Sequence, residues 1–134
     1  MTYLLDTNVC IDALNLRSSK VKQRLAQHTP DEIVVCSVVE AELHYGVAKA
    51  RDSQLAGEAT AKFLQPYRSL PFDSAAAAIY GRLRASLDKA GTPVGPNDLL
   101  IASIALAGGL TLVTANVREF SRVAGLAVED WTKP

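Results

Sequence analysis

The sequence predicts an α/β fold with three layers, α/β/α, around a central parallel sheet of four or five short strands. Short apolar runs alternate with longer helical patterns along the chain, as in sheets whose strands are joined by helices. The run at 33–36 lacks polar alternation, which is typical of a strand covered on both faces. The 134 residues are 49% hydrophobic and 21% charged, enough for one core. We therefore expect one domain over 1–134.

The first elements follow from changes in the apolar pattern. The apolar run over 3–5 is ended by Asp6, which indicates a buried strand followed by the start of a helix. A short helix is expected over 9–16. Apolar residues spaced among lysines and arginines predict an exposed amphipathic helix over 18–27. Ile33–Cys36 is β-branched and apolar and predicts the second strand.

The middle of the chain contains helix signals and one weak strand. Ser37 is followed three residues later by Glu40, a capping-box pattern that predicts a helix over 38–50. A second helix is expected over 53–65. The run at 70–72 contains a proline, which cannot donate to a central ladder, so we expect an edge strand there.

Glycines and prolines divide the last third of the chain. A long helix over 74–90 is stopped by Gly91-Thr92-Pro93. Gly95-Pro96-Asn97-Asp98 opens another helix, which is apolar on nearly every side and therefore belongs in the core. The remaining elements are short: a strand over 110–114, a helix over 117–123 and a strand over 126–128.

The charge balance and the cysteines exclude several classes of protein. Lys plus Arg and Asp plus Glu are 14 each, so the chain lacks the basic excess of a general nucleic-acid coat protein. Cys10 and Cys36 form no CxxC or metal-knuckle pattern and are expected to be buried free thiols. No signal-peptide pattern opens the chain, and Gly108-Gly109 interrupts the uncharged run over 99–115. We expect a soluble, cytoplasmic protein.

Acidic residues follow several of the predicted strands, at the edge where open α/β sheets bind ligands. Asp6 follows the first strand, Glu42 lies on the helix after the second, and Asp98 begins the buried helix. Asn116 and Glu119 follow the next strand. Because carboxylates brought together repel one another, their convergence indicates a hard divalent cation, magnesium or manganese.

Two glutamates close together on one helix need separate interpretations. Glu40 lies where a side chain reaches back to the cap amide of Ser37, so we interpret it as structural. Glu42 lies near the apolar face that contains Val39 and Leu43, so we expect it to be the inward carboxylate.

Structural alternatives exist for the other acids. Asp6 could only cap its helix, and Asp98 could only complement a helix dipole, although the apolar surroundings of Asp98 weaken that interpretation. His28 and His44 match no metalloprotease or nucleophile motif and are expected on the surface. The basic residues over 17–24 are expected on a solvated helix face.

Four motifs in order resemble those of PIN-domain ribonucleases, and most closely those of the VapC toxins of bacterial VapBC type II toxin–antitoxin pairs. The resemblance spans nearly the whole chain, through Val128-Glu129-Asp130-Trp131. It implies a PIN-like three-layer fold and a magnesium-dependent endoribonuclease, a hydrolase. The motifs are Leu4-Leu5-Asp6-Thr7-Asn8, Ala41-Glu42-Leu43-His44-Tyr45-Gly46, Gly91-Thr92-Pro93-Val94-Gly95-Pro96-Asn97-Asp98 and Val113-Thr114-Ala115-Asn116-Val117-Arg118-Glu119-Phe120.

The resemblance assigns roles to individual residues. It implies that Asp6, Glu42 and Asp98 are catalytic and hold Mg²⁺, for which Mn²⁺ can substitute. Many PIN domains have a fourth aspartate where this chain has Asn116, and the resemblance leaves open whether Asn116 or a catalytic Glu119 serves there. Supporting polar contacts are expected from Asn8, Thr114 and Asn116.

The resemblance also suggests a substrate and partners. The Gly-Thr-Pro-Val-Gly-Pro and Asn-x-Arg-Glu-Phe patterns resemble VapC nucleases that cut initiator tRNA in the anticodon loop. A homodimer is implied, with a VapB-like antitoxin laid across the catalytic groove. Two alternatives stay open: a PIN-like binding module that has lost cleavage, which Asn116 favours, and a phosphatase with an aspartyl nucleophile. Such phosphatases usually need a second aspartate where this chain has Asn8.

Overall fold

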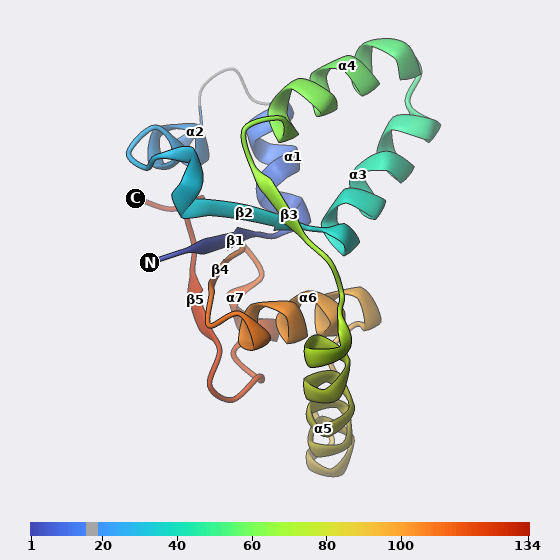
Figure 1. Cartoon of the computed structure of the whole chain (residues 1–134), viewed down its shortest axis with the longest axis vertical. Coiled ribbons are helices and arrows are strands. Elements are labelled where there is room, and N and C mark those ends of the chain that lie inside the picture. The colour runs from blue at the N-terminus through green and yellow to red at the C-terminus, as the bar shows by residue number, and fades with distance from the viewer. Residues whose placement is uncertain (16–18) are drawn as a thin grey trace.

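The computed structural model describes residues 1–15 and 19–134 of the chain. Within them, parallel strands form one five-stranded sheet in the order β3-β2-β1-β4-β5 (Figure 1). The order places β1 at the centre of the sheet and β3 and β5 at its edges. The strands are β1 Tyr3–Leu5, β2 Ile33–Cys36, β3 Arg68–Leu70, β4 Thr111–Val113 and β5 Ala127–Glu129.

Helices cover both sides of the sheet, so the predicted three-layer α/β/α fold is confirmed. In Figure 1, α1 and α4 lie on one side of the sheet and α5 and α6 on the other. None of the described helices is long and apolar enough to cross a membrane. The helices are α1 Thr7–Asn15, α2 Lys20–Leu25, the 3-10 turn η1 Pro30–Glu32, α3 Ser37–Lys49, α4 Ser53–Leu64, α5 Ser74–Ala90, α6 Pro96–Ala107 and α7 Val117–Phe120.

Helix α1 begins earlier than the apolar pattern predicts. The backbone N–H of Thr7 donates to the Asp6 carboxylate at 2.8 Å, so the helix starts at Thr7 instead of residue 9. Helix α2 is capped by Ser19, whose hydroxyl accepts the N–H of Lys22 at 3.0 Å. The expected ends of these two helices at Leu16 and Ser18, and Arg17 of the basic stretch, lie outside the described residues.

The predicted capping box at the start of α3 is wrong. Cys36 is the N-cap residue, and Ser37 is already the first helical residue. The side chain of Glu40 instead accepts a hydrogen bond from the Ser69 hydroxyl of β3 at 2.9 Å. Glu40 therefore has a structural contact, as expected, but it links α3 to a strand far along the chain.

The weak strand is an edge strand, as expected, but its position differs from the prediction. β3 covers Arg68–Leu70, and Pro71 follows the strand instead of lying within it. This shift keeps the backbone N–H groups of all three residues available for pairing with β2. The long helix α5 ends where predicted, because Gly91 adopts a left-handed conformation with φ of 71°.

The buried core includes the central strand β1 and helix α6. Leu4 and Leu5 of β1 are fully buried, and α6 buries residues on several of its sides, as its apolar sequence predicts. Cys10 and Cys36 are buried free thiols, which confirms that prediction. Burial raises the pKa of Cys36 to about 11 and raises that of Cys10 further above its ordinary value.

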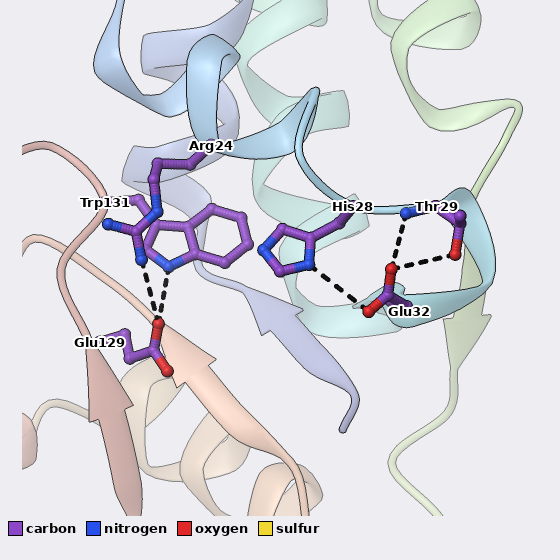
Figure 2. Close-up of polar contacts among 6 residues, drawn as sticks. All are labelled: Arg24, His28, Thr29, Glu32, Glu129 and Trp131. Carbon is purple, nitrogen blue, oxygen red and sulfur yellow. Dashed lines mark hydrogen bonds and ion pairs between the residues drawn. The ribbon is translucent and has the colours of Figure 1, made fainter.

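A cluster around Trp131 joins the C-terminal segment to the rest of the fold (Figure 2). The Trp131 ring is fully buried, and its Nε1 donates to Glu129 Oε1 at 2.9 Å. Arg24 Nη2 lies 3.3 Å from the same oxygen, and its guanidinium lies 5.3 Å from the ring centroid. His28 stacks on the ring with centroids 5.1 Å apart, and its Nδ1 lies 3.5 Å from Glu32 Oε2. His28 is thus half-buried in this cluster, whereas His44 is exposed as predicted.

Replacement of Trp131 should strongly destabilise the fold. Trp131→Ala leaves a cavity where the buried ring packs and should lower the free energy of unfolding by about 3–5 kcal/mol. Trp131→Phe keeps a ring on His28 but loses the hydrogen bond to Glu129, and a smaller loss is expected, about 1–2 kcal/mol. Both variants remove the one tryptophan of the chain and with it the usual fluorescence signal. Urea unfolding is therefore followed by circular dichroism.

His44→Ala is the matched control, since His44 is exposed and should leave stability unchanged. We propose that residues 1–134 form one domain, so wild-type unfolding should be a single transition. A Trp131→Ala variant as stable as wild type would contradict the role of the cluster, and two separate transitions would contradict the single domain.

Candidate active site

Asp6 follows the central strand β1 and is the most deeply held acid of the site. It is 3% exposed, and each carboxylate oxygen accepts a hydrogen bond. Oδ1 accepts the Thr7 N–H at 2.8 Å and Oδ2 accepts the Thr114 hydroxyl at 2.7 Å. Burial raises the pKa of Asp6, the two hydrogen bonds oppose that rise, and the nearby charges of Glu42 and Glu119 add to it.

Glu42 on α3 is linked to Asp6 by Thr7, which donates a hydrogen bond to each carboxylate. The Thr7 hydroxyl donates to Glu42 Oε1 at 2.7 Å, while the Thr7 N–H bonds Asp6. Glu42 therefore faces the site and Glu40 faces β3, as the helical periodicity predicts. The sequence alone assigns Thr7 no role of its own. The available signal was a hydroxyl residue directly after an acid at a strand end.

Asp98 lies half-buried in the first turn of α6. Burial, a hydrogen bond with Glu119, and the negative charges of Asp6, Glu119 and Glu42 raise the pKa of Asp98 to about 7. These electrostatic effects mean that the four acidic side chains lie near one another. Without a cation, the cluster therefore favours one of its carboxyl groups in the neutral form near pH 7.

Glu119 on α7 is fixed by donors on both of its oxygens. Oε1 accepts the Gly95 N–H at 2.8 Å, and Oε2 accepts Asn116 Nδ2 at 3.0 Å. The Gly95 N–H is the main reason that the pKa of Glu119 is lowered, so Glu119 stays charged beside Asp98. Asn116, where many relatives were expected to have an acid, orients Glu119 in this structure.

The supporting residues connect the site to the backbone. Thr114 is fully buried at the end of β4, and its Oγ1 also accepts the Asn116 N–H at 3.0 Å. Asn8 Oδ1 accepts the Ala115 N–H at a longer 3.4 Å. Asn8, Thr114 and Asn116 thus connect α1 to the loop after β4, beside the acidic side chains.

The donor set of this site suits a hard divalent cation. Its possible side-chain ligands are carboxylate oxygens. The ion pairs formed by the described residues, Arg24–Glu129 and His28–Glu32, involve none of these carboxylates. As placed, the described acidic, histidine and cysteine side chains do not form a ready group of three protein ligands. Magnesium keeps several waters and needs only one or two direct carboxylates, so the carboxylate chemistry of the site is compatible with such an ion.

Comparisons with known proteins agree with the fold and the motifs. The family model described as "PIN domain" matches residues 3–126. Ribonuclease VapC2 of Rickettsia felis is 38% identical over 134 residues, 99% of this chain and 100% of the relative. The tRNA(fMet)-specific endonuclease VapC of Shigella flexneri is 37% identical over 132 residues, 98% of this chain and 99% of the relative.

Solved structures of similar proteins have the same fold over the same length. A chain of VapBC2 from Rickettsia felis, bound to a promoter DNA fragment, matches with a TM-score of 0.91 at 37% identity, covering 98% of this chain and 99% of that one. A chain of DNA-bound VapBC from Salmonella typhimurium matches with a TM-score of 0.93 at 35% identity, covering 98% of each. The chain therefore belongs to the PIN-domain family and, within it, to the VapC ribonucleases of toxin–antitoxin systems.

Proposed function

We propose that this ribonuclease toxin cleaves the anticodon loop of initiator tRNA in a reaction that depends on magnesium. The observation that carries the proposal is the meeting of Asp6, Glu42, Asp98 and Glu119, from four segments, at the carboxyl end of the sheet. The full-length relative from Shigella flexneri is a tRNA(fMet)-specific endonuclease, which supports the choice of substrate. A cytoplasmic location is part of the same proposal, because tRNA is a cytoplasmic substrate.

Asp6, Glu42 and Asp98 are the residues that would hold the cation, directly or through water. Held by these residues, the cation would supply a more acidic water and polarisation of the phosphodiester. Two threonines orient the carboxylates: Thr7 and Thr114 hold Asp6 by hydrogen bonds, and Thr7 also holds Glu42.

Water is the nucleophile in this proposal, so the RNA 2′-hydroxyl does not take part in the attack. The products are then a 5′-phosphate and a 3′-hydroxyl. The carboxylates repel the RNA backbone when no cation is present, so the cation is needed for binding as well as for hydrolysis.

The proposed partners follow from the relatives. The similar solved structures are VapBC complexes, in which the toxin is bound to its antitoxin. We infer a VapB-like antitoxin for this chain as well, and a homodimer of the toxin. The alternatives of an inactive binding module and of an aspartyl phosphatase are not favoured by the full-length similarity to ribonucleases.

Cleavage should require a divalent cation. Purified protein with Mg²⁺ or Mn²⁺ should cut initiator tRNA in the anticodon loop, and excess chelator should abolish the cut, because the acidic site then repels RNA. End mapping of the products and gel assays with an elongator methionine tRNA as control measure site and selectivity. Full cleavage in chelator would contradict the metal dependence, and equal cutting of both tRNAs would contradict the substrate.

Two nearby glutamates provide a matched pair of variants. Glu42→Gln should lower cleavage at least about 100-fold, because even outer-shell partners of metal ligands matter on that scale. Glu40→Gln should cut like wild type, since the Gln carbonyl can still accept from Ser69. Glu40→Ala loses that hydrogen bond and should cost about 1 kcal/mol of stability with cleavage retained. An inactive Glu40→Gln with an active Glu42→Gln would reverse our assignment of the two faces.

The raised pKa of Asp98 predicts how stability depends on pH in chelator. The Asp98 carboxyl group binds a proton more tightly in the folded protein than in the unfolded chain, where its pKa stays near the ordinary value of 3.8. The free energy of unfolding should therefore rise as pH falls from about 7 toward 4, the window between the folded and unfolded pKa values of Asp98. Asp98→Asn should be more stable than wild type at pH 8, with a smaller pH dependence. Parallel slopes in urea titrations at several pH values would refute this.

A further inference from the structure

Beside the acidic residues, α3 presents an aromatic side chain that the proposed hydrolysis does not use. Tyr45 is 66% exposed and lies one turn after Glu42. Residues three and four apart share a face of a helix, so Glu42, Tyr45 and Lys49 form a stripe along α3. An exposed ring directly beside a candidate active site is a surface available to an incoming molecule.

A cleft of about 490 Å³ joins this ring to the acidic residues. Its lining includes Thr7 and Glu42 at the acidic end, Tyr45 and Lys49 along α3, Asn97 of α6 and the apolar side chain of Ile11 on α1. A molecule that fills the cleft therefore contacts both the Tyr45 ring and Glu42. This continuity is the main reason to assign the ring to the substrate.

The chemistry of the lining suits a nucleobase next to a phosphate. Lys49 Nζ lies over one face of the Tyr45 ring, 4.8 Å from its centroid, so a base would stack on the opposite face with a positive charge close by. Unpaired bases of RNA loops bind proteins by stacking on aromatic rings, with cations on the adjacent backbone. The Asn97 side chain is exposed at the start of α6 and carries the donor and acceptor groups that a base edge can pair with.

Gly46 gives an independent indication that the cleft beside Tyr45 binds a ligand. It lies inside α3, where glycine costs about 1 kcal/mol relative to alanine. A Cβ atom built at Gly46 would meet no atom of the chain within 4 Å, so internal packing does not demand glycine there. Gly46 also lines the cleft, where a side chain would narrow the space beside Tyr45.

We propose that Tyr45, with Lys49 beside it, is the stacking platform for one unpaired base of the RNA loop next to the scissile phosphodiester. The inference rests on the proposed ribonuclease function and adds a specificity-determining residue to it. Stacking holds the flanking base and so places its phosphodiester at Glu42, while Asn97 contacts the edge of that base.

A cycle of protein and RNA changes tests the platform. Tyr45→Ala should weaken binding of the anticodon stem-loop and raise KM by about 5-fold to 100-fold, the scale of one stacked base, with a smaller change in kcat. Tyr45→Phe keeps the ring and should behave like wild type. An abasic nucleotide placed at each loop position in turn should weaken wild-type binding at one position next to the cut. At that position the abasic nucleotide should cause no further loss of binding affinity in the Tyr45→Ala variant.

Leu55→Ala is the control, because Leu55 is 64% exposed on α4 and does not line the cleft. Its binding and its melting temperature should match wild type, and Tyr45→Ala should share that melting temperature. Gly46→Ala should weaken binding without loss of stability, since its methyl group occupies the cleft.

The outcomes separate this inference from the proposed function. If wild type cuts the stem-loop but Tyr45→Ala binds and cuts equally well, the platform is refuted and the nuclease stands. If Tyr45→Ala cuts normally but resists inhibition by its antitoxin, the ring belongs to the antitoxin interface and the inference is wrong. If wild type neither binds nor cuts RNA, both proposals fail together.

Discussion

The hydrogen bond from Thr114 to the buried carboxylate of Asp6 is the contact on which the arrangement of the site depends. It joins the end of the central strand β1 to the end of its neighbour β4 at a distance of 2.7 Å. The neighbouring backbone reinforces it, because the Asp6 N–H donates to the Val113 carbonyl. A buried carboxylate is costly unless both oxygens have donors, so the ends of these strands cannot separate without exposing or orphaning Asp6.

Helix α3 is held from both sides by hydrogen bonds to its two glutamates. Glu40 accepts from Ser69 on the edge strand, and Glu42 accepts from Thr7 at the start of α1. Because these side chains lie on opposite faces, rotation of the helix about its axis would lengthen at least one of the two bonds. The direction of Glu42, and with it that of the stripe through Tyr45 and Lys49, is therefore set by contacts outside α3.

The sequence predicts the features that depend on local pattern. The strands at 3–5 and 33–36 follow from apolar runs, and the buried α6 follows from apolar residues on most of its sides. The rule that ligands bind at the carboxyl ends of parallel strands predicts from the sequence that Asp6, Glu42 and Asp98 lie together.

What the sequence misses depends on partners that are distant in the chain. The pattern Ser37–Glu40 is a valid local capping box, but Ser69 offers Glu40 a hydroxyl from 29 residues away. Likewise, nothing near His28 indicates that Trp131 will stack on it. These contacts exist only after the sheet has assembled, so local propensity cannot reveal them.

The buried thiols have a chemical consequence of their own. The Cys10 N–H donates to the Asp6 carbonyl, Cys36 is the N-cap residue of α3, and the negative charge of Asp6 acts on both thiols. Thiolates are the species that oxidants and alkylating agents attack, and burial raises the pKa of both groups. Because both thiols are also buried, the folded protein protects them from oxidants at positions next to the candidate active site. Alkylation of either cysteine would mark molecules in which this part of the sheet has opened.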